Sequence, residues 1–394
     1  MKKIAFVIPW FAEGIPGGAE SELCGLVKHL SEYGMELEVL TTCVEQFASD
    51  WSYNYYTPGM DTTSNIPIRR FPVKKRNQKV FDKINWKFIN NIPVTLKEED
   101  IFLKEMVNSS ALYRYISKNK DEYSLFVFIP YMFGTTYFGC QICPEKTILI
   151  PCLHDESYAY MTRFKEVFSK IRGMIFHSKP EFQLAESIYD LSDVESSVLG
   201  EGLDTNISGD SQRFREKYNI KDDFIIYAGR KDTGKNVDTL INYFSTFLAR
   251  NPQKIKLVII GGGYIDIPDK AKNDILDLGY IPLQDKYDAF AASLLLCQPS
   301  LNESFSLAIM ESWLCGRPVL VHEKCLVTKG FVIESSGGLY FSGYADFEGC
   351  LNYFILNNKI ANTMGNLGKK FVKDNFTWDI IVDRYICYFK RLSA

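Results

Sequence analysis

The sequence has no run of apolar residues that approaches the length of about 18 needed to cross a bilayer, so no membrane span is predicted. The apolar start at residues 1–14 is broken by Pro9 and Glu13, and no small-residue cleavage site follows it. We therefore expect a buried first strand there instead of a signal peptide. Ten cysteines without a secretory signal are typical of reduced thiols. The expected location is cytoplasmic, with peripheral binding to the inner face of the membrane left open.

Neither sign of charge is in excess. The 45 Lys and Arg residues stand against 48 Asp and Glu residues, for a net charge of −3, which argues against nucleic acid as a partner. Cys140 and Cys143 have the spacing of a redox motif or of half a zinc site, but no second cysteine pair or nearby histidine completes a metal site. We expect thiols without a ligand role, and no metal or other cofactor.

The chain alternates short β-rich runs with amphipathic helices, which is typical of parallel βαβ units in an α/β protein. Two such sets predict two doubly wound, Rossmann-like domains, at 1–199 and 200–375, with a C-terminal helix at about 376–394 that packs back on the first domain. Ligands usually bind such sheets at the carboxyl ends of their strands. The predicted strands are 3–8, 37–40, 125–129, 147–150, 174–177, 224–229, 256–261, 294–297 and 319–321.

The stretch NESFSLAIMES, residues 302–312, holds two glutamates eight positions apart. A helix predicted after Ser304 puts Glu303 at its mouth and Glu311 about two turns inside, roughly 12 Å apart along the axis. The free backbone N–H groups of residues 304–307 would hold an anion between the two carboxylates. The spacing suits an elongated ligand such as a sugar joined to a nucleoside through a pyrophosphate. The alternative is a helix-dipole carboxylate at Glu303 and a solvated helix face.

The stretch AGRKDTGKN, residues 228–236, places Arg230 and Lys235 around a turn that follows a predicted strand. Two cations there could neutralise a pyrophosphate and the charge that builds on a leaving nucleotide. A solvated basic turn is the alternative, since exposed charges are common in turns.

Two features of the first predicted domain also suggest ligand binding. Gly17 and Gly18 open a helix and would let an anion approach the backbone closely, although a tight turn without a ligand is equally compatible. His154 follows a predicted strand, where loops of open α/β sheets often carry function, but a single histidine is more often structural. Asp155 beside it could be a plain helix N-cap.

The segment 69–87, RRFPVKKRNQKVFDKINWK, combines basic residues with apolar and aromatic ones. Two interpretations stay open. It is either a solvated basic face or a surface for anionic lipid head groups or a lipid-diphosphate acceptor.

Taken in order along nearly the whole chain, these motifs resemble the retaining GT-B glycosyltransferases of the Glu-x7-Glu group, which are similar to glycosyltransferase family 4. The resemblance is stronger in the second half of the chain than in the first. Two departures stand out, because Ser306 and Asn236 occupy positions where family members often have glycine. The residues that carry the resemblance are Gly17-Gly18-Ala19-Glu20, His154-Asp155, Gly202-Leu203-Asp204, Gly229-Arg230 with Lys235, Gly261-Gly262-Gly263, Pro299-Ser300 with Glu303 and Glu311, and Gly316-Arg317-Pro318-Val319.

The resemblance implies transfer of a hexosyl unit from a nucleoside-diphosphate sugar to a hydroxyl of a glycan or lipid-linked saccharide, with retention of configuration and without a metal. It implies a role in bacterial surface polysaccharide synthesis. Catalytic roles would fall to Glu303, near the transferred sugar, and to Arg230, Lys235 and His154. The implied donor-binding residues are Gly17, Gly18, Arg230, Lys235, Ser304, Phe305, Ser306, Leu307 and Glu311, with Glu311 on the ribose hydroxyls.

Two rival functions from other classes remain. A non-catalytic sugar-nucleotide-binding or glycan-binding protein of the same fold would be expected to lose the charged residues that this chain keeps. A nicotinamide-dependent oxidoreductase would need G-x-G-x-x-G after its first strand, and IPWFAEGIPGGAE does not supply it.

Overall fold

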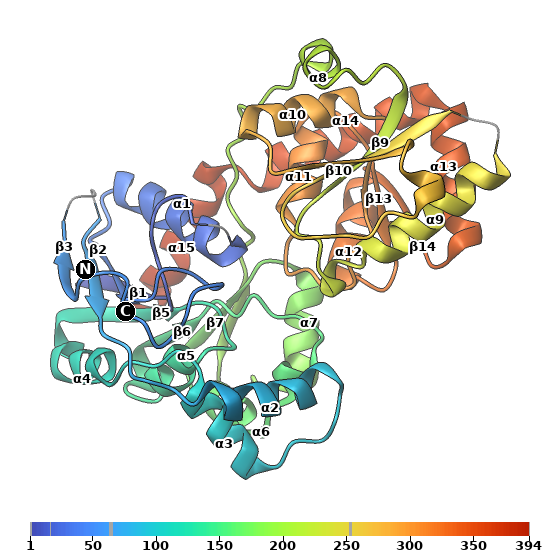
Figure 1. Ribbon diagram of the computed structural model, residues 1–394. Helices are drawn as coiled ribbons and strands as arrows, with labels where there is room; N and C mark the ends of the chain where they lie inside the picture. Colours follow the sequence, from blue (N-terminus) through green and yellow to red (C-terminus); the bar gives the residue numbers. More distant parts are fainter. Residues whose placement is uncertain (1, 16, 63–65, 252–253, 394) are drawn as a thin grey trace. The chain divides into compact units, whose positions relative to one another are not determined.

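The computed structural model describes residues 2–15, 17–62, 66–251 and 254–393, and these form two compact units. Unit 1 comprises residues 1–202 and 378–394, and unit 2 comprises residues 203–377 (Figure 1). The sequence placed this boundary between residues 199 and 200.

Unit 1 is built on an eight-stranded sheet in the order β3-β4-β2-β1-β5-β6-β7-β8, parallel except for the β3–β4 pair at one edge. Its middle strands read as continuous apolar runs, because helices cover both faces of a parallel sheet (Figure 1). The strands are β1 (Lys3–Val7), β2 (Leu37–Thr42), β3 (Gly59–Asp61), β4 (Ile68–Phe71), β5 (Tyr123–Phe128), β6 (Thr147–Leu149), β7 (Gly173–Phe176) and β8 (Glu195–Val198).

The helices of unit 1 connect these strands. They are α1 (Gly18–Glu32), α2 (Gln78–Ile89), α3 (Leu96–Glu105), α4 (Ser110–Asn119), α5 (Gly134–Cys140), α6 (Thr162–Phe168), α7 (Lys179–Ile188) and α15 (Trp378–Ser393).

The last helix of unit 1 comes from the far end of the sequence. Trp378, at the start of α15, stacks on His29 of α1 with ring centroids 4.4 Å apart. A Cβ atom on Gly25 would lie 2.4 Å from the Trp378 ring, and one on Gly202 would lie 2.2 Å from it. The indole therefore occupies space that only two glycines leave free.

Unit 2 repeats the same topology with six strands, all parallel, in the order β11-β10-β9-β12-β13-β14. The strands are β9 (Asp223–Ala228), β10 (Ile255–Ile260), β11 (Ile275–Gly279), β12 (Leu296–Gln298), β13 (Val319–His322) and β14 (Gly338–Phe341). The helices are α8 (Ser211–Tyr218), α9 (Val237–Arg250), α10 (Leu283–Ala292), α11 (Leu307–Leu314), α12 (Leu326–Ser335), α13 (Tyr344–Leu356) and α14 (Asn358–Asn375).

The two predicted doubly wound sheets are confirmed, and each predicted strand overlaps an observed one. In both sheets the strand order reverses beside the first strand, between β1 and β5 and between β9 and β12. At such a switch point, the loops that leave neighbouring strands diverge and open a crevice outside the carboxyl ends of the strands. This is where each unit is expected to bind a ligand.

The basic segment 69–87 is not one surface, as either interpretation of it assumed. Arg69 and Arg70 lie in β4, where Arg70 is buried and donates to the backbone oxygen of Phe11 at 2.8 Å. Arg69 pairs with the buried Glu38 at 2.8 Å. This short strand between β3 and β2 escaped prediction because its two arginines disguise a paired and largely buried run. Only the part of the segment from Lys74 onward is mainly exposed.

Candidate functional site

The candidate site of unit 2 begins with glycines at the carboxyl ends of β9 and β10. Gly229 and Gly261 have positive φ angles of 158° and 120°, and a Cβ atom on Gly261 would lie 2.1 Å from the Gly229 carbonyl oxygen. Lys231 N–H then donates to the Gly262 oxygen at 2.8 Å. The two strand ends thus touch through their backbones, which fixes the start of the loop that carries Arg230 and Lys235.

Lys235 and Glu303 meet at the switch point, from the loops after β9 and β12. Lys235 Nζ lies 2.7 Å from Glu303 Oε1, and the two side chains are 19% and 10% exposed. Gln298 Nε2 also donates to Glu303 Oε1, at 3.2 Å. A mostly buried cation and carboxylate, with an amide beside them, form a polar centre at this edge of the sheet.

Arg230 lies in the same loop but stands apart from this pair. Its side chain is 67% exposed, and Nε lies 3.3 Å from Asp232 Oδ2. Its backbone oxygen accepts a hydrogen bond from the hydroxyl of the buried Tyr227 at 2.5 Å. The backbone of Arg230 is therefore held while its guanidinium is exposed to solvent.

The helix that follows Glu303 starts later than predicted. Helix α11 begins at Leu307, so Ser304, Phe305 and Ser306 belong to the preceding turn, and the estimate of 12 Å along one helix axis does not apply. The cause is Ser306, whose left-handed conformation (φ 85°, ψ 80°) interrupts the helical backbone at the N-cap. A glycine would adopt this conformation without steric cost.

The turn before α11 is held by a ring cluster and contains a buried hydroxyl. Phe305 is 2% exposed and packs edge-on against Phe376 and Phe331, at centroid distances of 5.0 and 5.4 Å. Its side chain is therefore core, which leaves its backbone as the candidate donor-binding group. Ser306 Oγ and Gln298 Oε1 are buried without a hydrogen-bond partner among the described residues. Buried polar atoms of this kind call for a partner, which a bound ligand would supply.

Glu311 lies in the middle of α11 and is paired with a residue that the sequence did not indicate. Lys286 Nζ, on α10, lies 2.6 Å from Glu311 Oε1, and the Glu311 side chain is 13% exposed. Burial raises the pKa of Glu311, and the Lys286 ammonium opposes that rise. No sequence signal links the two residues, because they belong to different helices and meet only in the folded unit.

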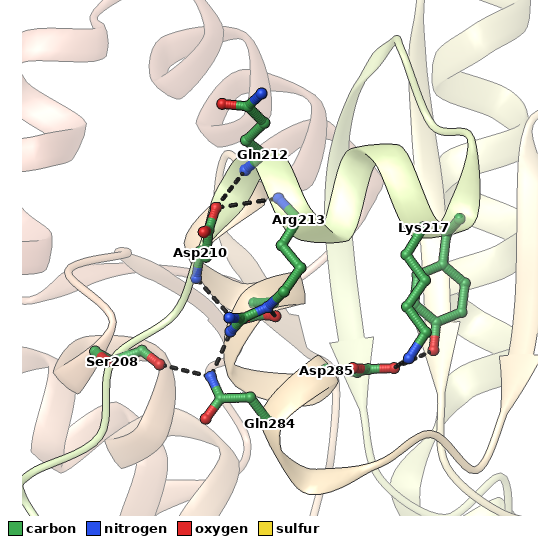
Figure 2. A network of polar contacts seen from close by, with 9 residues as sticks. Ser208, Asp210, Gln212, Arg213, Lys217, Gln284 and Asp285 are labelled. Carbon is green, nitrogen blue, oxygen red and sulfur yellow. Dashed lines mark hydrogen bonds and ion pairs between the residues drawn. The ribbon is translucent and has the colours of Figure 1, made fainter.

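Helix α10 is in turn fixed to α8 by a polar network (Figure 2). Asp288, at 1% exposure, accepts hydrogen bonds from Arg213 Nη2 at 2.6 Å and from the backbone N–H of Asp210 at 2.8 Å. Lys217 Nζ lies 2.6 Å from Asp285 Oδ2. These ion pairs attach α8 to one side of α10, while Lys286 connects α10 to α11.

The predicted residues of unit 1 lie on two of its loops. Gly17 is the N-cap of α1, with a φ angle of 149°, and Gly18 is the first helical residue. His154 follows β6, is 33% exposed, and has its Nδ1 atom 3.8 Å from Glu156 Oε1. Asp155 accepts a hydrogen bond from the Tyr160 hydroxyl at 2.7 Å and is not an N-cap, because Glu156 holds that place before the short 3-10 helix 157–160.

Unit 1 also contains a buried charged cluster that the sequence did not predict. His177 Nε2 lies 2.6 Å from Glu22 Oε1, and His177 Nδ1 lies 3.6 Å from Glu181 Oε2. Burial opposes the charged imidazolium, but the carboxylates of Glu22 and Glu181 outweigh it and raise the pKa of His177 to about 10. Glu181 also accepts the backbone N–H groups of Leu153 and His177, each at 2.7 Å. The cluster thus attaches the segment before His154 to β7 and α1.

Metal-ligating residue types come together in one group of the described residues, formed by Glu22, Cys152 and His177, whose ligand atoms lie within 4.8 Å of one another. Two ligands of one zinc ion, each at about 2.0–2.1 Å and in tetrahedral geometry, would be roughly 3.3 Å apart. The 2.6 Å contact between Glu22 and His177 is instead that of a direct ion pair. Cys140 and Cys143 are buried free cysteines.

Comparison with known proteins gives these geometries a context. The family model for "Glycosyl transferases group 1" matches residues 210–371, which lie within unit 2. An uncharacterised glycosyltransferase of Methanocaldococcus jannaschii is 22% identical, with both chains covered completely. A D-inositol 3-phosphate glycosyltransferase of Kribbella flavida is 25% identical, over 49% of this chain and 50% of that protein.

Among solved structures, Anabaena HepE in complex with UDP-glucose aligns with a TM-score of 0.70 at 15% identity, over 99% of this chain and 100% of that one. The fold is GT-B, with two Rossmann-like domains of parallel strands. The family match covers the segments that carry Arg230, Lys235, Glu303 and Glu311. None of the helices described is both long and apolar enough to cross a membrane.

Proposed function

We propose that this protein is a glycosyltransferase that moves a hexosyl unit from a nucleoside-diphosphate sugar to a hydroxyl of a glycan or lipid-linked saccharide. The observation that carries the proposal is two cation–carboxylate contacts of unit 2, Lys235 with Glu303 at the switch point and Lys286 with Glu311 between α10 and α11. They lie on loops and helices inside the region matched by the glycosyl transferase family model.

The Lys235–Glu303 pair supplies a mechanism. In the free protein the Lys235 ammonium is bound to Glu303. A donor pyrophosphate would compete for this cation, as phosphate oxygens form strong charge-assisted hydrogen bonds with lysine. Glu303 would then be released toward the transferred sugar, while Lys235 and the exposed Arg230 stabilise the negative charge that develops on the leaving diphosphate.

Metal independence and retention of configuration are part of this proposal. The cations of Lys235 and Arg230 at the leaving group take the role that a divalent ion has in metal-dependent transferases. Transfer rates should therefore be the same with EDTA as with magnesium. Retention is proposed to proceed by attack of the acceptor hydroxyl on the face from which the diphosphate leaves, and proton NMR of the first-formed product would show its anomeric configuration.

A thermal-shift panel of UDP, GDP, dTDP and their sugars tests the donor class. A ligand at about 100 times its dissociation constant should stabilise the fold by roughly 2.7 kcal/mol. HepE has been crystallised with UDP and with UDP-glucose, which makes the uridine compounds the first to examine. If no nucleotide in the panel raises the melting temperature, the donor assignment fails.

Two rival functions have distinct signatures. A non-catalytic binding protein of the same fold would bind the nucleotide sugar tightly, yet would neither hydrolyse nor transfer it. A nicotinamide-dependent oxidoreductase would change NADH fluorescence on titration. The match to the glycosyl transferase family model and the two charged pairs favour the transferase.

The acceptor class remains as the sequence suggested it, with a role in bacterial surface polysaccharide synthesis and a contact with anionic membrane. The membrane-facing part of 69–87 would be α2 and the residues before it. Trp86 and Ile89 are 59% and 64% exposed, and four lysines around them are exposed as well: Lys74, Lys75, Lys79 and Lys83. Exposed apolar side chains among cations are suited to an anionic bilayer surface.

Sedimentation with vesicles tests this contact. The protein should bind phosphatidylglycerol vesicles more than phosphatidylcholine vesicles, and the double variant Trp86→Ser/Ile89→Ser should lose most of that binding. Leu356→Ser, which changes an exposed apolar residue of unit 2, is the matched control and should bind like the wild type. If the double variant binds the vesicles as well as the wild type does, this surface does not contact the membrane.

A further inference from the structure

Lys286 stands out because it connects α10, which carries no predicted site residue, to Glu311, the carboxylate proposed to bind the nucleotide. It projects from α10 toward α11 and places Nζ 2.6 Å from Glu311 Oε1. Its side chain is 26% exposed and that of Glu311 is 13% exposed. The pair is thus mostly withdrawn from water. In such a partly buried position an ammonium and a carboxylate interact much more strongly than at an exposed surface.

The pair engages only one of the two Glu311 oxygens. Among the described residues, Oε1 accepts from Lys286 and Oε2 has no hydrogen-bond donor. A carboxylate held in this way presents its second oxygen to a ligand while the first fixes its rotation. Two neighbouring hydroxyls, such as those of a ribose, are donors suited to that free oxygen.

The surroundings of Glu311 make Lys286 the group that keeps it charged. Burial raises the pKa of Glu311, and Lys286 lowers it through charge and hydrogen bonding. Burial raises the pKa of Cys315 to about 12 and also raises that of Tyr287, so both are neutral near pH 7. The other charged groups that act on these two neighbours of Glu311 are Asp204, Asp288 and Lys369.

We propose that Lys286 is a nucleotide-positioning residue, which holds Glu311 ionised and oriented so that the ribose hydroxyls of a nucleoside diphosphate can donate to it. The proposal rests on the proposed function, since it concerns the same site. It adds a residue of a second helix, α10, to the site. Lys286 acts through Glu311 and not on the reacting atoms.

The test is calorimetry with UDP, GDP and dTDP on the full chain at pH 6 and pH 8. The variant Lys286→Met removes the cation, so the pKa of Glu311 rises further and its charged form is lost at a higher pH than in the wild type. The ratio of wild-type to variant affinity, in which protonation of the ligand cancels, should be about tenfold at pH 6 and clearly smaller at pH 8. Lys286→Arg should keep affinity within about threefold of the wild type, since it keeps the charge.

A double-mutant cycle separates action through Glu311 from a general structural effect. In the background of Glu311→Gln, Lys286→Met should have no further effect on affinity, because the group on which it acts is gone. Lys217→Met, which breaks the ion pair with Asp285 on the same helix α10, is the matched control and should leave the pH dependence unchanged. If Lys286→Met does not fold, as judged by its thermal transition, Lys286→Gln takes its place.

The outcomes are distinct. Wild-type affinity in Lys286→Met at both pH values overturns the proposal, as does a loss of equal size at pH 6 and pH 8 that persists in the Glu311→Gln background. If the wild type itself binds none of the three nucleotides, the proposed donor class fails and the inference fails with it. Binding by the wild type with no effect of Lys286 would leave the glycosyltransferase proposal standing alone.

Discussion

The two units share one strand order but hold their buried charges differently. In unit 1, His177, Glu22 and Glu181 form a cluster with side chains no more than 5% exposed, and its pairs connect backbone segments of the unit. In unit 2, the pairs of Lys235 with Glu303 and of Lys286 with Glu311 are 10–26% exposed and lie on segments that follow β9, β11 and β12. Charges of the first kind are costly to leave without a partner, whereas charges of the second kind can exchange partners with a ligand.

The largest expected effect concerns the two cations proposed to bind the donor diphosphate in unit 2. Lys235→Ala and Arg230→Ala should each lower turnover by about 100- to 1000-fold, the typical result of removing one donor aimed at developing charge. Turnover at saturating donor, together with the thermal transition of each variant, is the measurement. Lys217→Ala, which removes a lysine of unit 2 from α8, is the control and should retain activity. Near-wild-type turnover in Lys235→Ala would remove the distinction between the two units.

The second prediction concerns the buried cluster of His177, Glu22 and Glu181 in unit 1. His177→Gln should lower the free energy of unfolding by about 3 kcal/mol, because it leaves two buried carboxylates without their cation. Urea titration followed by tryptophan fluorescence reports mainly on this unit, because Trp313 is the one tryptophan of five in unit 2. Nucleotide affinity of the folded variant should not change.

The same cluster predicts a pH dependence of wild-type stability. The folded-state pKa of His177, about 10, lies above its unfolded value of about 6.5. The stabilisation is therefore complete below about pH 6.5 and is lost as the pH rises toward 10. His177→Gln should abolish this alkaline loss. His322→Gln is the control in unit 2, where burial lowers the pKa of a histidine instead, and it should leave the alkaline loss intact.

The third prediction separates the two glutamates of unit 2. Glu311→Gln should weaken binding of the free nucleoside diphosphate and of the nucleotide sugar alike, by about 1.5–3 kcal/mol. Glu303→Gln should leave affinity for the diphosphate nearly unchanged and lower turnover of the sugar donor. Calorimetry with the diphosphate, beside turnover with the full donor, measures both. An equal loss of diphosphate affinity in both variants would show that the carboxylates do not serve opposite ends of one ligand.

The smallest effect is expected at Ser306, which lies between Glu303 and Glu311 in the sequence. Ser306→Gly should stabilise the free protein by about 1 kcal/mol, since it removes a left-handed backbone cost and a buried hydroxyl without a partner among the described residues. Ser306→Ala keeps the backbone cost and removes only the hydroxyl, so the pair of variants separates the two contributions. Thermal denaturation measures them. A loss of donor affinity in both variants would show that the hydroxyl contacts the ligand.

The sequence predicted the features that depend on neighbours along the chain. Continuous apolar runs such as those of β9 and β10 located the central strands, and the glycine loop located the start of α1. Short strands were missed, because β4 carries two arginines and the edge strand β14 has only four residues. The start of α11 was predicted too early, since no local pattern announces a serine with positive φ.

The sequence predicted only some of the residues that form the buried charged pairs. Glu303, Glu311, Arg230 and Lys235 stand in motifs, but Lys286 is 25 residues from its partner and His177 is 155 residues from Glu22. Contacts at such separations are decided by how helices pack on a sheet, which composition and periodicity do not encode residue by residue. They follow only once the strand order is known.

The return of α15 to unit 1 has a consequence for synthesis. Unit 2 is one continuous stretch, so it can fold as soon as its own residues have left the ribosome. The packing of unit 1 cannot be completed at that stage, because the space between Gly25 and Gly202 is filled by Trp378, which is translated after all of unit 2. The unit translated first is thus completed last, and until then the apolar residues that α15 covers, such as Phe6 beneath Phe389, are open to chaperones and proteases.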